Sequence, residues 1–174
     1  MTISRFTLGP AAFLVAVAVG APPAAAAEHR IGGGVHYWKT VDDLADDDFD
    51  VDEDGLATVL SYQYVPGGLL RLEVDVEYFE KGFGGSTDAA YSPQVYLVLG
   101  SGWYAALGGG VIYSSDFEDD VSDPFYAARL GLDMELLPRL HLDLNANYRF
   151  DAWSELENAD TDTVTLGAVV RFGI

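Results

Sequence analysis

A run of acidic residues near position 50 has the spacing of a cation-binding loop. Asp50, Asp52 and Asp54 alternate with other residues and are followed by Gly55. Carboxylate oxygens at alternate positions, followed by a glycine that permits a tight turn, open the calcium-binding loop of the EF-hand. The sequence therefore makes Asp50, Asp52 and Asp54 candidate ligands for Ca²⁺.

The remainder of the calcium motif is missing. Its last ligand is a glutamate that binds through both carboxylate oxygens, and Ser61 occupies that position. Neighbouring carboxylates repel one another unless water or a cation neutralises them, and runs of charge are usually solvated. We therefore expect a hydrated surface, or looser bridging by Ca²⁺ or Mg²⁺ between loops or to the phosphates of lipopolysaccharide. No other cofactor is expected.

Ser114 and His36 are the residues from which a hydrolytic site could be built. Such a site needs a nucleophile beside a histidine and an acidic residue that orients it. Nothing in the spacing of these two residues pairs them. The sequence therefore names no catalytic residue, and we expect the protein not to be an enzyme. A lipid-modifying activity is the least favoured of the functions considered.

The segment Leu69–Phe79 carries charge on one face and apolar side chains on the other. Arg71, Glu73, Asp75 and Glu77 alternate with apolar residues, and this period of two is that of a β-strand. In a soluble, lipocalin-like barrel the charged face would meet water. In an outer-membrane barrel the charged face lines the interior and the apolar face meets lipid.

Eight segments show this alternation and predict the fold class. They cover about 29–40, 56–65, 69–79, 91–99, 103–114, 125–136, 140–150 and 163–174. Three short turns alternate with four longer loops, about 41–55, 81–89, 115–124 and 151–162, and acids are concentrated in the first, third and fourth loops. This rhythm is typical of membrane barrels, whose strands need roughly 9–11 residues. We expect an all-β fold, an eight-stranded antiparallel up-and-down transmembrane β-barrel.

The charged faces of these segments would meet inside the barrel. Glycines share these faces, as a crowded interior requires and a solvated exterior does not. Buried charges persist only when they are paired, so we expect ion pairs that plug the interior, with His36 beside them. The residues expected in this network are Arg71, Glu73, Asp75, Glu77, Arg129, Asp133, Glu135, His141, Asp143, Arg149 and Arg171. Carboxylates outnumber arginines in this set, so the alternative function, a narrow channel for ions or small solutes, would favour cations.

Residues 1–27 have the pattern of a cleavable signal peptide. Arg5 precedes the apolar run 11–21, and Ala25 and Ala27 satisfy a small-residue cleavage site. Residues 28–174 then form the barrel domain. The net charge of −19 argues against a nucleic-acid partner, and the absence of cysteine excludes disulfides.

The signal peptide, the eight alternating segments and the loop rhythm resemble the small outer-membrane β-barrel family typified by the OmpA membrane domain and OmpX. The resemblance implies a monomer in the outer membrane of a Gram-negative bacterium, in contact with lipid and lipopolysaccharide and inserted by the barrel-assembly machinery. Members usually end in an aromatic residue, whereas this chain ends Phe172-Gly173-Ile174. We expect a structural or surface-interaction role in the cell envelope, carried by the acidic extracellular loops.

Overall fold

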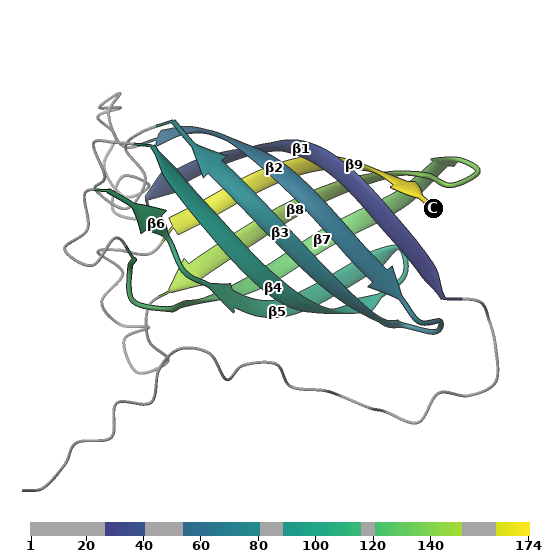
Figure 1. Ribbon diagram of the computed structural model, residues 1–174. Coiled ribbons are helices and arrows are strands. Elements are labelled where there is room, and N and C mark those ends of the chain that lie inside the picture. The colour runs from purple at the N-terminus through teal and green to yellow at the C-terminus, as the bar shows by residue number, and fades with distance from the viewer. Residues whose placement is uncertain (1–26, 41–53, 81–88, 116–120, 151–162) are drawn as a thin grey trace, which may run out of the picture.

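The computed structural model describes residues 27–40, 54–80, 89–115, 121–150 and 163–174, and these form a closed β-barrel (Figure 1). Among them no helix is long and apolar enough to cross a membrane. The strands are β1 (Glu28–Thr40), β2 (Asp54–Val65), β3 (Leu70–Phe79), β4 (Ala90–Gly100), β5 (Trp103–Gly110), β6 (Tyr113–Ser114), β7 (Phe125–Leu137), β8 (Leu140–Phe150) and β9 (Thr163–Gly173). All of these strands except the two-residue β6 are long.

The sheet closes on itself through antiparallel pairs. The strand order is β3-β2-β1-β9-β8-β7-β5-β4-β6, and β3 also pairs with β4. The first and last strands, β1 and β9, pair from Arg30 opposite Gly173 to Thr40 opposite Thr163. Closure gives every long strand two neighbours, so backbone groups are paired on both sides. The expected eight-stranded antiparallel barrel is confirmed.

One expected strand is interrupted. The segment 103–114 divides into β5 and β6, with Val111 and Ile112 between them. Pairing with β4 stops at Gln94 opposite Gly110 and resumes at Tyr91 opposite Tyr113. The skipped residues of β4 include Pro93, which has no N–H group for the ladder. The alternation of faces continues across the gap, because Ser114 is buried and Tyr113 is exposed.

The short connections lie together at one end of the barrel, called here the short-turn end (Figure 1). Among the described residues, those with positive φ lie in or next to these connections, and they are Gly67, Gly68, Gly100 and Arg139. Two of these connections are therefore turns of the glycine-dependent kind that the sequence predicted. The opposite end is called the long-loop end.

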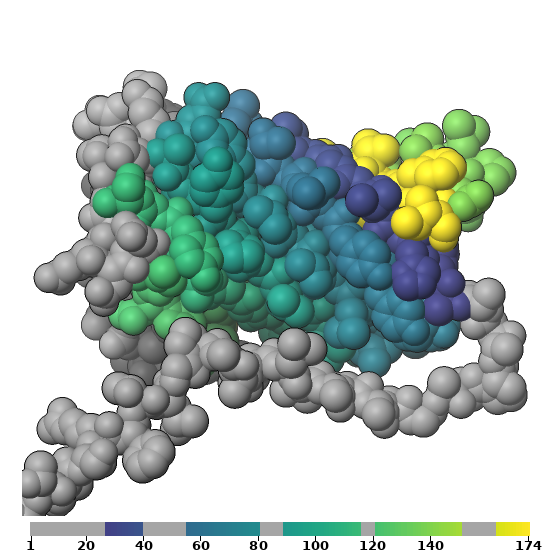
Figure 2. All heavy atoms as spheres, viewed as in Figure 1, coloured from purple at the N-terminus to yellow at the C-terminus, as the bar shows by residue number. Residues whose placement is uncertain are grey.

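The two faces of the sheet differ in chemistry. Leu97 and Val74 face outward and are 50% and 42% exposed, whereas the adjacent Tyr96 and Glu73 face inward and have no exposed surface. The same alternation holds along β7 and β8. Figure 2 shows part of this outer wall, over β2 to β4. The apolar side chains therefore cover the outside of the barrel and the charged ones fill the inside.

Close contact between β1 and β9 leaves no room for a Cβ atom on two inward-facing glycines, Gly32 and Gly34. A Cβ atom on the inward-facing Gly34 would overlap the carbonyl oxygen of Ala168 and lie 2.6 Å from the Cα of Val169. On the outward-facing Gly33 its nearest neighbour would be the carbonyl oxygen of Val59, at 3.2 Å.

Gly34→Ala is expected to lower the free energy of unfolding by about 1–3 kcal/mol, because backbone atoms must move to admit the methyl group. Gly33→Ala is the matched control and should change it much less. Urea titration of both variants, refolded in the same detergent, measures the difference. Equal losses for the two variants would show that backbone entropy, rather than crowding, sets the cost.

Candidate functional site

The barrel interior brings together most of the residues that the sequence predicted there. Each comes from the inward-facing positions of its strand, so the period of two places them in one enclosed space. The buried members are Arg71, Glu73, Asp75, Glu77, Arg129, Asp133, His141, Asp143, Arg149 and Arg171.

Arg129 is the centre of the network. Its guanidinium pairs with Glu73 and, at 2.9 Å, with Asp75, both across the barrel on β3. Its Nε donates to Asn147 on the neighbouring β8. The guanidinium carbon lies 3.8 Å from the centroid of the Tyr96 ring, which adds a cation–π contact. Arg129 is therefore neutralised and hydrogen-bonded from several strands at once.

Arg171 links this centre to β8. Its Nη2 lies 2.8 Å from Glu73, its Nη1 lies 3.1 Å from Asp143, and its Nε donates to Ser61 at 2.9 Å. Asp143 also accepts from the Tyr104 hydroxyl at 2.9 Å. The middle of the interior is thus a continuous set of paired charges with almost no exposed surface.

The long-loop end of the interior combines an ion pair with apolar residues. Glu77 accepts from Arg149 at 2.5 Å and contacts His36 Nδ1 at 2.6 Å. Beyond it lies a group called here the apolar cap, made of the buried residues Trp38, Ala57, Phe79 and Ala90. The Trp38 and Phe79 rings meet edge to face with centroids 6.4 Å apart.

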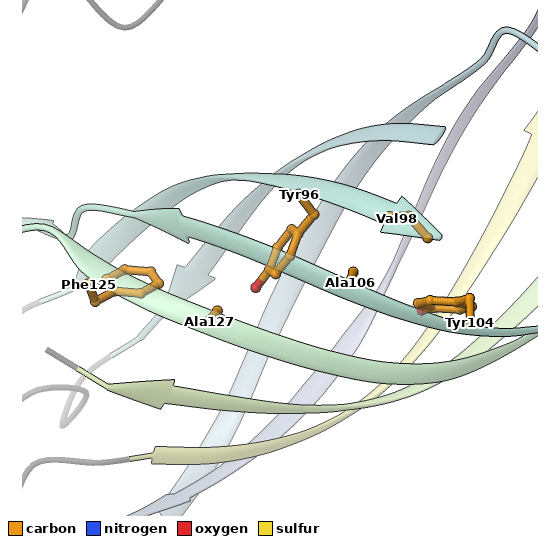
Figure 3. Packing of buried hydrophobic residues seen from close by; sticks show 6 residues of the cluster. All are labelled: Tyr96, Val98, Tyr104, Ala106, Phe125 and Ala127. Carbon is orange, nitrogen blue, oxygen red and sulfur yellow. The ribbon is translucent and has the colours of Figure 1, made fainter. Parts of the chain in front are cut away.

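A second apolar group lines the wall formed by β4, β5 and β7 (Figure 3). It consists of Tyr96, Val98, Tyr104, Ala106, Phe125 and Ala127. The Arg71 guanidinium lies 5.1 Å from the Tyr104 ring centroid and that of Arg149 lies 5.4 Å from Phe125. These arginines of the charge network therefore lie against aromatic rings of this apolar wall.

At the short-turn end, Asp133 collects several donors. It accepts from Arg30 at 2.8 Å and from Arg71, and His141 Nδ1 lies 3.2 Å away. Arg30 also donates two bonds to Glu28, at 3.0 and 3.1 Å. Glu28 is at the rim, and these hydrogen bonds hold the pKa of its carboxyl below the ordinary value.

Glu135 does not join the network, contrary to the sequence prediction. It is exposed and accepts a hydrogen bond from the Arg139 backbone N–H at 3.2 Å. The pairing of β7 with β8 shifts register between Glu135 and Leu137, so the strict alternation ends there and the side chain leaves the interior.

The sequence analysis did not name Arg30, which is buried. The sequence pattern that places Arg30 inside was nevertheless present, because Arg30 shares a period-two face with Gly32, Gly34 and His36. With Arg30 included and Glu135 excluded, the buried set of described residues contains five arginines and five carboxylates. The expected excess of carboxylates is therefore wrong, and with it the basis for cation preference.

The candidate calcium ligands remain a prediction. Asp50 and Asp52 lie outside the described residues, and Asp54 is the first residue of β2. Within the described ranges no group of three or more histidine, cysteine or acidic side chains is placed to hold a metal ion. Ser114 and His36 do not lie on neighbouring strands, since β6 pairs with β4 and β1 pairs with β2 and β9.

No protein-family model and no curated protein sequence matches the chain. Solved structures with a similar course of the chain include Neisserial surface protein A, at 16% identity and a TM-score of 0.49, covering 84% of this chain and 96% of that one. The N-terminal β-barrel domain of Pseudomonas aeruginosa OprF matches at 11% identity and a TM-score of 0.49, covering 85% and 97%. The Yersinia pestis outer membrane protein Ail matches at 18% identity and a TM-score of 0.43, covering 83% and 99%. The barrel of this chain follows from its own strand pairing, in which β3 and β4 close the sheet.

Proposed function

We propose that this chain is an outer-membrane β-barrel protein of a Gram-negative bacterium with a structural or surface-interaction role. The observation that carries the proposal is an interior filled by balanced, mutually paired charges inside a wall whose outer face is apolar. A polar inside and an apolar outside reverse the arrangement of a water-soluble barrel.

Aromatic residues support the membrane placement. Tyr78 and Tyr91 face outward toward the long-loop end, with ring centroids 5.0 Å apart. Trp103 at the start of β5 is 78% exposed, and Tyr62 is bonded to His29 Nδ1 at 2.7 Å toward the short-turn end. Amphipathic rings at the two ends of an apolar band are typical of the two bilayer interfaces.

The filled interior favours a scaffold over a channel. Glu73, Asp75 and Arg129 have at most 1% of their surface exposed, and each is paired. An ion crossing the barrel would have to separate these pairs in a low-dielectric space, which is costly. The function then depends on the surface of the protein, and the acidic loops are the part of that surface for which the sequence predicts a role. Cation bridging from these loops to lipopolysaccharide phosphates is part of this proposal, as are cleavage after Ala27, insertion by the barrel-assembly machinery and a monomeric state.

Single-channel recording in planar bilayers tests the proposal. The refolded protein is expected to show no conductance steps, and Arg129→Ala is expected to show none either, because Glu73 stays paired with Arg171 and the apolar cap is intact. Leu130→Ala, on the outer face of the same strand, is the control. Discrete steps in the wild type that change with Arg129→Ala but not with Leu130→Ala would overturn the scaffold and establish a channel.

A further inference from the structure

Only one of the three guanidinium nitrogens of Arg71 has a hydrogen-bond partner among the described residues. Its Nη1 donates to Asp133 and, at 3.3 Å, to Gln63. Its Nε and Nη2, which form the other edge of the guanidinium, have no hydrogen-bond partner among the described residues. The side chain is 3% exposed, so bulk water does not serve this edge. A buried charged donor without a partner requires an explanation.

Arg71 also shares its carboxylate partner with another arginine. Its carboxylate partner, Asp133, is shared with Arg30 and lies beside His141. Glu73, two residues along the same strand face, is already bound by Arg129 and Arg171. Arg30 is bound by Glu28 as well, so the charges around Asp133 are balanced, and what the unused edge of Arg71 offers an anion is its two parallel N–H donors.

We propose that the Nε–Nη2 edge of Arg71 binds a halide-sized monovalent anion inside the barrel. A halide accepts both N–H bonds without bringing further oxygens that need donors, which phosphate or sulfate would do. Val98 lies opposite Arg71 on β4 and the Tyr104 ring lies 5.1 Å from its guanidinium carbon. Both side chains have at most 5% of their surface exposed, which favours a small anion.

An anion would enter from the short-turn end. Arg30 and Asp133 are each 8% exposed and His141 is 7% exposed, so this layer touches solvent. The apolar cap closes the other end. Access from this end alone is compatible with an interior that does not conduct.

Two measurements test the site. The first compares thermal unfolding of the refolded chain in chloride and in gluconate at equal ionic strength, with the expectation of a saturable rise in Tm of about 2–4 °C in chloride. Arg71→Lys keeps the positive charge beside Asp133 and removes the bidentate edge, so it should abolish the rise. Arg149→Lys, at the long-loop end, is the matched control and should retain it.

The second measurement is diffraction from wild-type crystals grown in bromide, which requires no variant to fold. An anomalous peak beside Arg71 Nε and Nη2 is the expected result. An absent peak, or a rise in Tm in chloride that is equal in wild type and Arg71→Lys, would overturn the anion site. Water would then be the partner of Nε and Nη2. Conductance is not a readout of either measurement, so this inference and the proposed scaffold fail independently.

Discussion

Arg129→Met is expected to lower the free energy of unfolding by about 3–5 kcal/mol, the cost of leaving a buried charge without its partner. Glu73 would still be held by Arg171 at 2.8 Å. Asp75 would have no such second arginine, because its ion pair is with Arg129. Its other carboxylate oxygen has no hydrogen-bond partner among the described residues. Most of the loss is therefore assigned to Asp75.

A double-mutant cycle separates this cause from lost packing on Tyr96. Asp75→Asn added to Arg129→Met removes the uncompensated charge, so the double variant should regain about 1–2 kcal/mol over Arg129→Met alone. Urea titration in detergent micelles gives the four values, with Leu130→Ala as a control for damage to β7. A double variant less stable than Arg129→Met would show that the amide, rather than the charge, is what the interior cannot hold.

The sequence predicted the barrel and the facing of its side chains because both depend on local alternation. On the buried face of β3 from Arg71 to Glu77, and on that of β8 from His141 to Arg149, every second residue is charged, an amide or a histidine. A closed sheet of this size leaves one inside and one outside. The period of two together with the number of segments therefore decided the fold and the content of the interior.

The pairing inside the barrel could not be predicted in the same way. Arg129 meets Glu73 and Asp75, which are 56 and 54 residues away on a strand that is not its neighbour. Contacts across the barrel depend on strand tilt and stagger, which alternation does not encode. Glu135 shows the same limit, because a register shift near the turn ended the alternation that had placed it inside.

The apolar cap was also not predicted, although Phe79 continues the period-two face that carries Arg71 and Glu77. A single aromatic residue at the end of a charged face does not show what it contacts. The structure brings Phe79 on β3 together with Trp38 on β1 and with Ala57 between them on β2, and Arg149 lies 5.9 Å from the Phe79 ring centroid. With Ala90 on β4, the cap is thus assembled from four neighbouring strands that each contribute one inward residue near the long-loop end.

Phe79→Ala is expected to lower the free energy of unfolding by about 3–5 kcal/mol, because Phe79 has no exposed surface and its removal leaves a cavity beneath the long-loop end. Tyr78→Ala is the matched control. Tyr78 is the adjacent residue on the outer face, 36% exposed and in ring contact with Tyr91. Loss of this ring contact should lower the free energy of unfolding by about 0.5–1.5 kcal/mol, and the apolar area lost with the ring should lower it somewhat further.

Bilayer recording of the same two variants shows whether the apolar cap or the ion pairs around Arg129 prevent conductance. The pairs around Arg129 lie deeper than the cap and are untouched by Phe79→Ala, so we expect this variant to remain non-conducting despite its lower stability. Water entering the new cavity would reach Glu77 and Arg149, which are themselves paired, and would stop at the next layer of ion pairs. Conductance steps in Phe79→Ala but not in Tyr78→Ala would instead identify the cap as the barrier, because ions would then be passing the Arg129 cluster with its pairs intact.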